Sequence, residues 1–114
     1  MATSQAIRLR PEELRSLGFA SISGTYAGIG ASFDNPIKIL FVQNLTDATL
    51  MFSLDGIDDH FPLVENGFIL LDIGTNKSFE QGLFIAEGTR IYVKESGTPT
   101  SGSVYVSVFY GSGN

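Results

Sequence analysis

The feature that most constrains the fold of this chain is a period of two in its apolar residues. In the segments 48–54, 90–94 and 104–110, apolar side chains recur at every second position. Successive side chains of a β-strand point to opposite faces, so this alternation predicts strands with one face on a core. Two further runs, 37–42 and 68–73, are apolar almost throughout, which predicts strands that are covered on both faces.

Turn-forming residues separate these runs, as at Asp34-Asn35-Pro36 and Asp55-Gly56. They divide the chain into about eight segments, near 19–25, 37–43, 48–54, 60–64, 68–73, 82–85, 89–95 and 103–110. Short strands at roughly ten-residue spacing predict an all-β fold, a two-sheet antiparallel sandwich, jelly roll or small barrel. No segment is suited to the helix of a βαβ crossover, which excludes the doubly wound folds.

The first seventeen residues do not share this period. Pro11 stands at a plausible first helical position and is followed by two glutamates, which predicts one or two helical turns that end at Gly18. We therefore expect residues 1–17 to form an N-terminal arm with a short helix, and residues 18–114 to form a single β-sandwich domain. Such an arm frays unless it docks on its own domain or on a neighbour.

Length and charge narrow the classes of function. A chain of 114 residues has the usual size of one domain with one core. The net charge of −5 disfavours nucleic acid as a partner, because phosphate binding needs clustered lysine and arginine. The first fifteen residues carry three arginines and two glutamates, a net +1, and the remaining residues carry a net −6. Only 17% of residues are charged, which leaves more surface free to meet a partner.

The chain contains no cysteine, so it has no disulfide framework, cysteine-ligated zinc site or thiol nucleophile. Its first residues lack the apolar run of a secretory signal, and no stretch reaches the ~20 apolar residues that span a membrane. We expect a protein with no membrane partner that is made and used in a cytoplasm, or assembled from one.

No residues have the pattern of an active site. His60 is the only histidine, and Asp58 and Asp59 lie too close to it in the chain to orient it as the third member of a triad. A Gly-x-Ser-x-Gly elbow is absent, and so is the tryptophan that usually accompanies the paired carboxylates of glycosidases. We expect a protein that is not an enzyme and that uses no cofactor.

Asp55, Asp58 and Asp59 place three carboxylates within five residues, which leaves a weak calcium site as an alternative. The spacing of an EF-hand is absent, and Asp-Gly is a common turn pair whose aspartate caps its own backbone. We therefore expect a solvated turn here rather than a metal site. The glycine-rich segment 24–30 matches no phosphate-binding motif and predicts a turned connection.

Aromatic side chains are the more informative candidates for a binding surface. Tyr92, Tyr105 and Phe109 fall on the opposite side of their strands from the aliphatic residues. Two arrangements are compatible with this pattern. Either the second sheet covers the aromatic side and leaves the aliphatic side outermost, or the aromatic side is the outer one and forms an interface.

Four segments of the chain resemble small β-sandwich structural proteins of tailed-bacteriophage virions. They are ILFVQNLTDATLMFSLDG at 39–56, LLDIGTNK at 70–77, GTRIYVK at 88–94 and SGSVYVSVFY at 101–110. The hairpin pattern N-x-T-D followed by S-x-D-G and the closing strand G-x-V-Y-V-S-V carry the resemblance, which covers most of residues 19–110. It implies a capsid decoration or cement protein, or an accessory protein of the neck, collar or tail.

From these observations we expect a non-enzymatic virion component, assembled in the host cytoplasm, that forms a homo-oligomer and docks on capsid, portal, neck or tail subunits. An arm that becomes ordered on docking suits such a role. The residues expected at the partner interface are Arg8, Leu9, Arg10, Leu14, Leu17, Tyr92, Tyr105 and Phe109. The alternative is a carbohydrate- or receptor-binding β-sandwich module, for which the residues from Asp55 to Asp59 together with Tyr92 are the candidates.

Overall fold

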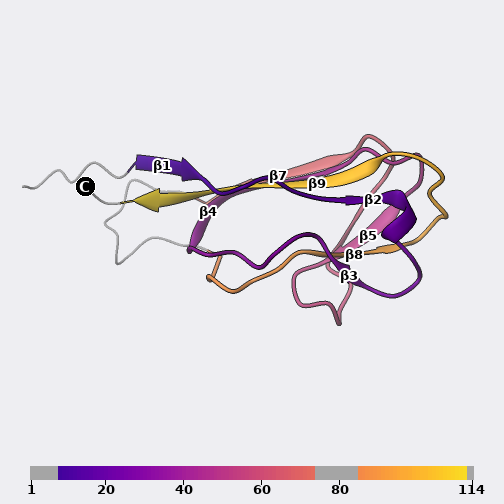
Figure 1. Ribbon diagram of the computed structural model, residues 1–114, viewed down its shortest axis with the longest axis horizontal. Coiled ribbons are helices and arrows are strands. Elements are labelled where there is room, and N and C mark those ends of the chain that lie inside the picture. The colour runs from indigo at the N-terminus through magenta and orange to yellow at the C-terminus, as the bar shows by residue number, and fades with distance from the viewer. Residues whose placement is uncertain (1–7, 74–84, 113–114) are drawn as a thin grey trace, which may run out of the picture.

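The computed structural model describes residues 8–73 and 85–112, and in them the chain forms a sandwich of two antiparallel sheets (Figure 1). This confirms the predicted fold class. The five-stranded sheet contains β1 (Arg8–Pro11), β2 (Arg15–Gly18), β4 (Ile37–Asn44), β7 (Phe68–Asp72) and β9 (Ser103–Ser112). The four-stranded sheet contains β3 (Ala27–Gly28), β5 (Leu50–Ser53), β6 (Phe61–Leu63) and β8 (Tyr92–Glu95). No helix in the described part of the chain is long and apolar enough to cross a membrane.

The long strand β9 organises the larger sheet. On one side it pairs with β1 and β2, which follow each other along its length, and on the other side it pairs with β4. β7 pairs with the far side of β4 and so lies at the edge of this sheet. In the smaller sheet the order is β3, β8, β5, β6. Every pairing is antiparallel, as short connections between strands allow.

The core lies between the sheets and is built from the alternating aliphatic positions. In β9 the valines face inward, and they meet apolar side chains of β4, β5 and β8. The fully buried side chains on these strands include Leu40, Val42, Leu50, Phe52, Val93, Val104, Val106 and Val108. Each such side chain contributes roughly 1.5–3 kcal/mol by leaving water. The aliphatic side of the strands therefore faces the core, and the aromatic side of β9 is the outer one.

The predicted helix in the N-terminal arm is wrong. Pro11 is the last residue of β1, and residues 15–18 form β2 instead of a helical turn. Both strands pair with β9, so residues 8–18 belong to the larger sheet. The local helix signals are weak, because a one- or two-turn helix is marginal alone, whereas pairing with β9 satisfies the backbone of the extended chain.

Two other predicted segments also differ. Residues 19–21 form a 3₁₀ turn where a strand was expected, and the short strand β3 follows inside the glycine-rich segment. Of the predicted strand 82–85, residues 82–84 lie outside the described residues, and Ile85 forms a single bridge with Ile37.

β7 departs from its prediction in a way that bears on function. The apolar run 68–73 predicts a strand covered on both faces, but among the described residues only one face is covered. Ile69 packs against the core, whereas Phe68 and Leu70 point away from it and are 62% and 56% exposed. The prediction is therefore wrong for the part of the chain that the structure describes, in which an apolar strand face has no covering layer.

Candidate functional site: the outer face of the five-stranded sheet

The outer side of β9, β4 and β7 forms an almost uncharged surface, which we call the outer face. Residues that are directly opposite in neighbouring strands point to the same side of a sheet, so the strand register gives its members. It is composed of three cross-strand rows, which are Phe109–Ile39–Asp72, Ser107–Phe41–Leu70 and Tyr105–Gln43–Phe68. Asp72 is its only charged residue.

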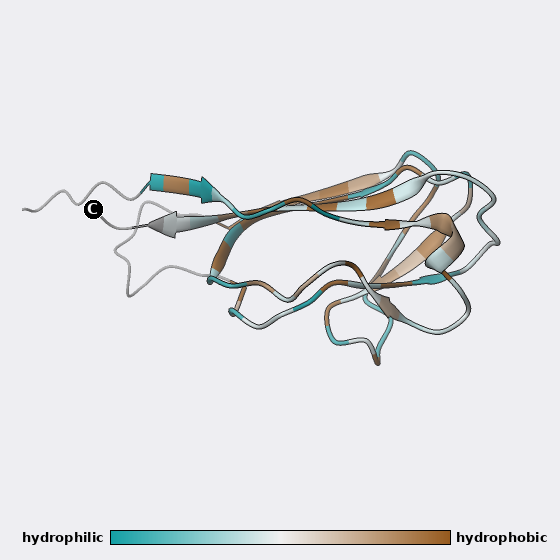
Figure 2. Cartoon of the chain, viewed as in Figure 1, coloured by the Kyte–Doolittle hydropathy of each residue, from teal (hydrophilic) through white to brown (hydrophobic). Residues whose placement is uncertain are grey.

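Side chains of the outer face pack against one another across the strands. The rings of Phe41 and Phe68 meet edge to face, with their centroids 5.5 Å apart and an interplanar angle of 72°. Phe41, Tyr105 and Phe109 are half-buried, while the apolar side chains of β7 are the most exposed. Figure 2 shows apolar stretches along β4, β7 and β9. Exposure of apolar surface on this face therefore increases toward the β7 edge.

This surface is unlike the solvent face of an ordinary antiparallel sheet. Antiparallel sheets that face water on one side usually alternate apolar residues inside with polar residues outside. On the outer face apolar and aromatic residues instead occupy six of the nine positions in the three rows. Contiguous apolar patches on folded domains are typical of binding surfaces, which makes the outer face the candidate functional site.

The structure separates the three aromatic residues predicted at the interface. Tyr105 and Phe109 both lie on the outer face. Tyr92 lies on β8, in the other sheet, where its ring is 5.7 Å from the guanidinium carbon of Arg90 and adjoins Gly56. The periodicity of the sequence showed which side of a strand each aromatic occupies, but it could not show that the strands belong to different sheets.

The five residues of the N-terminal arm that were predicted at the partner interface occupy three kinds of position. Arg8, Leu9 and Arg10 are exposed on β1, beside the end of β9 (Figure 1). Leu14 lies between β1 and β2 and is 56% exposed. Leu17 packs against the core of its own subunit. Of this group, Leu17 thus serves the fold of the chain itself, while the other four are accessible.

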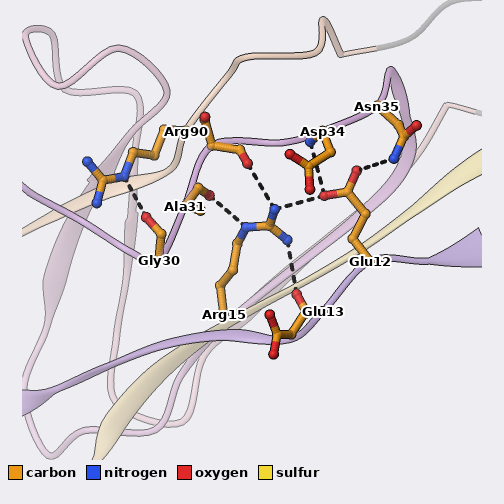
Figure 3. Close-up of polar contacts among 9 residues, drawn as sticks. Glu12, Glu13, Arg15, Gly30, Ala31, Asp34, Asn35 and Arg90 are labelled. Carbon is orange, nitrogen blue, oxygen red and sulfur yellow. Dashed lines mark hydrogen bonds and ion pairs between the residues drawn. The ribbon is translucent and has the colours of Figure 1, made fainter.

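A buried ion pair holds the N-terminal strands to the body (Figure 3). The side chain of Arg15 is 7% exposed, and its Nη2 bonds the Oε1 of Glu12 at 2.8 Å. Its Nε donates to the carbonyl of Ala31 at 2.7 Å, and Nη2 also donates to the carbonyl of Ser32 at 3.0 Å. The guanidinium carbon lies 5.1 Å from the centroid of the Phe33 ring.

Glu12 completes this connection from the other side. Its carboxylate accepts hydrogen bonds from Asn35 Nδ2 at 2.8 Å and from the backbone N–H of Asp34 at 3.3 Å. Burial alone raises the pKa of Glu12, but the bonds from Asn35, Asp34 and Arg15 outweigh it and hold the pKa below its ordinary value. The sequence did not indicate this pair, because the segment 31–35 that bonds to both members lies at least sixteen residues away and an arginine is ordinarily exposed.

The acidic loop after β5 is organised as a turn, as predicted. The carboxylate of Asp55 accepts hydrogen bonds from the backbone N–H groups of Ile57 and Asp58, at 2.8 and 2.9 Å, and from Ser53 Oγ at 2.8 Å. These bonds, with that from Ile57 the strongest, lower the pKa of Asp55 to about 2. Nδ1 of His60 accepts a hydrogen bond of 2.9 Å from the backbone N–H of Leu54.

Asp59 turns to a different set of partners. It accepts a hydrogen bond from the hydroxyl of Tyr26 and pairs with Lys94 Nζ at 3.1 Å, and Lys94 Nζ also lies 4.8 Å from the centre of the Tyr26 ring. The carboxylates of Asp55 and Asp59 therefore do not converge on one point. Within the described residues, no group of three or more acidic or histidine side chains is arranged to hold a metal ion.

In comparisons with models of protein families, with curated proteins and with solved structures, no match to this chain was found.

Proposed function

We propose that this protein is a non-enzymatic structural component of a tailed-phage virion, a capsid decoration or cement protein or an accessory of the neck, collar or tail. It self-associates and docks on other virion subunits through the outer face of its five-stranded sheet. The observation that carries the proposal is this apolar, nearly uncharged face, on which Phe68 and Leu70 are 62% and 56% exposed.

The energetics of such a face support association. Fully covering one leucine or phenylalanine side chain contributes roughly 1.5–3 kcal/mol. A few such side chains at the centre of an interface supply most of the binding energy of a typical complex. The aromatic residues of the outer face, Phe41, Phe68, Tyr105 and Phe109, are of the type that is enriched at such centres.

Charge supports the choice of this face over the others. Each chain carries a net charge of −5, so two copies repel one another through most of their surfaces. The outer face has Asp72 as its single charge, and therefore opposes the approach of another acidic subunit least. The resemblance to virion sandwich proteins gives the context in which a subunit of this kind works.

Mass spectrometry of gradient-purified phage particles, from a host strain that carries the gene, tests the virion role. The chain is expected in the particle fraction at a fixed ratio to the major capsid or portal protein. Recovery of the chain only among unassembled proteins of the lysate contradicts the proposal.

A matched pair of tyrosine variants tests the face. Tyr105→Glu places a charge on the outer face, and Tyr92→Glu places the same charge on the other sheet. In particles assembled with each variant, mass spectrometry should find Tyr92→Glu at the level of the unchanged chain and Tyr105→Glu at a much lower level. Circular dichroism checks that both variants fold. Equal levels of the two variants in the particles contradict the use of the outer face.

One cluster favours a second candidate, a carbohydrate- or receptor-binding module. Tyr26, Asp59 and Lys94 place an aromatic ring beside two charged groups. A sugar stacks on such a ring and bonds to such groups. Binding on a glycan array that is lost in Tyr26→Ala, with an unchanged oligomer, would favour this module over the assembly role.

A further inference from the structure

The two sheets present four edges in the described residues, and three of them are protected against pairing with another chain. β3 is only two residues long, and β6 is three residues long with Pro62 at its centre. The edge formed by β1 and β2 is interrupted between its two strands and carries Pro11 and three arginines. Short strands, proline and charged side chains are the usual means by which sheet edges avoid association.

β7 has fewer of these protections. It is five residues long, contains no proline, lysine or arginine, and reads Phe-Ile-Leu-Leu-Asp, with its single charge at the last residue. Among the residues that the structure describes, its only strand partner is β4. A regular, apolar edge strand of this kind is a template for another strand.

The hydrogen bonds to β4 show which backbone groups of β7 face outward. The N–H of Asn44 donates to the carbonyl of Gly67 and the N–H of Ile73 donates to the carbonyl of Lys38, both at 2.8 Å. Opposite residues of an antiparallel pair alternate between bonded and non-bonded, so Ile69 and Leu71 also bond to β4. The backbone N–H and C=O groups of Phe68, Leu70 and Asp72 therefore point to the open edge.

We propose that β7 pairs antiparallel with β7 of a second copy of this chain, about a two-fold axis that passes midway between the Leu70 residues of the two copies. In this register Leu70 lies opposite Leu70 of the second copy, and Phe68 lies opposite its Asp72. All three outward-facing residues then exchange hydrogen bonds with the second strand. A shift of two residues in either direction leaves some of these groups without a strand partner, so the centred register satisfies the edge best.

The proposal deepens the proposed function and rests on it, because it names the edge through which a second copy joins and leaves the outer face to other virion subunits. The two-fold axis is perpendicular to the sheet, so the outer faces of both copies lie on the same side and join along β7. Phe41, Phe68 and Leu70 of each copy then form one apolar surface, which remains available to a further virion subunit.

Symmetry favours a second copy over an unrelated strand, and the charges on β7 do not oppose it. The strand is self-complementary, because Phe68, Leu70 and Asp72 of one copy exchange backbone hydrogen bonds with the same three residues of the other copy. Asp72 of one copy lies opposite Phe68 of the other, so the two Asp72 residues are four strand positions, or about 14 Å, apart. That separation exceeds the Debye length of about 10 Å at 0.1 M salt, so the repulsion between these carboxylates is screened.

Amide hydrogen exchange, followed by NMR above and below the midpoint of association, tests the pairing directly. The amides of Phe68 and Leu70 are expected to exchange slowly in the associated protein and quickly after dilution. The amides of Ile69 and Leu71 bond to β4 and should stay protected at both concentrations, which makes them internal controls. Equal exchange at Leu70 under both conditions overturns the proposal.

Proline scanning of the strand provides the second test. Leu70→Pro removes an N–H that points to the open edge, which an edge strand tolerates. Two hydrogen bonds at the axis are lost, so the dissociation constant should rise about 10- to 100-fold. Leu70→Ser is the control that keeps the N–H, and it should retain protection of the Phe68 amide at high concentration. Leu71→Pro removes a bond to β4 instead and should lower the melting temperature.

Each possible mass in solution either supports or overturns the β7 pairing. A dimer, or an assembly with an even number of copies that Leu70→Pro divides, supports the proposal. A strict monomer, an odd-numbered oligomer, a polydisperse aggregate or an oligomer unchanged by Leu70→Pro overturns it. Mass spectrometry of particles distinguishes the failure of one proposal from the failure of the other. A chain that is monomeric in solution but present in particles contradicts only the β7 pairing. A dimer that is absent from particles contradicts only the virion role.

Discussion

The guanidinium of Arg15 and the carboxylate of Glu12 meet at 2.8 Å with their side chains only 7% and 4% exposed. The pair connects β2 and the residue after β1 with the segment 31–35, through bonds to Ala31, Ser32 and Asn35. No buried side-chain nitrogen or oxygen in the described residues lacks a hydrogen-bond partner. A network satisfied in this way stabilises the fold only while both members are present.

Replacement of Arg15 by alanine should therefore destabilise the protein strongly. The variant leaves the buried carboxylate of Glu12 without its cation and frees the carbonyls of the 31–32 segment. We expect the free energy of unfolding to fall by about 3–5 kcal/mol, measured by urea denaturation. Arg10→Ala, at an exposed position of β1, is the matched control and should stay within about 0.5 kcal/mol of the unchanged chain. A similar loss for both variants would show that the buried pair is dispensable.

Asn44 should contribute as much to the stability of the fold as an apolar core residue does. Its side chain is fully buried at the end of β4, and its Nδ2 donates to the carbonyls of Ala48, Leu63 and Val64 at 2.9–3.1 Å. Asn44→Ala leaves these buried carbonyls without a donor, and each such loss costs about 1–3 kcal/mol. Asn44→Asp keeps the acceptor oxygen and removes the donors. It should therefore also destabilise in thermal denaturation at pH 7, and a stable aspartate variant would contradict the donor role.

Alanine variants of two glycines with nearly equal φ angles allow the cost of backbone strain to be measured apart from the cost of steric overlap. Gly102 has φ of 90° and Gly88 has φ of 89°. A Cβ atom at Gly88 meets open space, whereas one at Gly102 overlaps the carbonyl oxygen of Leu45. Gly88→Ala should lower the free energy of unfolding by about 1–3 kcal/mol through backbone strain alone. Gly102→Ala should lower it further, and equal losses in urea denaturation would contradict the close approach of Leu45.

Asp55 should contribute to stability in a pH-dependent manner. Its pKa is depressed to about 2 in the folded chain by the backbone N–H of Ile57 and its neighbours, against an ordinary value of 3.8. A depressed carboxyl pKa stabilises the fold fully above the unfolded value and loses that effect as the pH falls toward the folded value. The melting temperature of the unchanged chain should exceed that of Asp55→Ala at pH 6, and the gap should shrink between about pH 4 and pH 2. A gap that is constant over this range would contradict the role of the carboxylate.

The sequence predicted the parts of the fold that depend on local alternation. Strands β5 and β9 form where the alternation predicts them, and the Asp55 turn forms where the Asp-Gly pair indicates. The alternation left open which side of β9 faces the core, and the structure places the valines there. The N-terminal strands could not be predicted in the same way. Whether Pro11 ends a strand or begins a helix depends on its pairing with Phe109 at an edge of β9, 109 − 11 = 98 residues away, and such pairing overrides weak local propensity.

The candidate site was predicted only in part. Alternation placed Tyr105 and Phe109 on one side of β9, but only the pairing of β4 with both β9 and β7 shows that Phe41 and Phe68 join them. The run 68–73 was expected to be covered on both faces. Among the described residues only one face is covered, because Phe68 and Leu70 point away from the core, and an unbroken apolar run cannot show this.

The position of β9 in the larger sheet determines when this sheet can form during synthesis of the chain. It is central in that sheet, yet it follows the other eight strands in the sequence, so β1, β2 and β4 have no common partner until it has been synthesised. At roughly 5–20 residues per second, about 5–20 s separate the synthesis of Arg8 from that of Ser103. The rows of side chains that make up the outer face therefore come into register only after synthesis of β9. The outer face of a nascent chain is thus incomplete until its own sandwich can close.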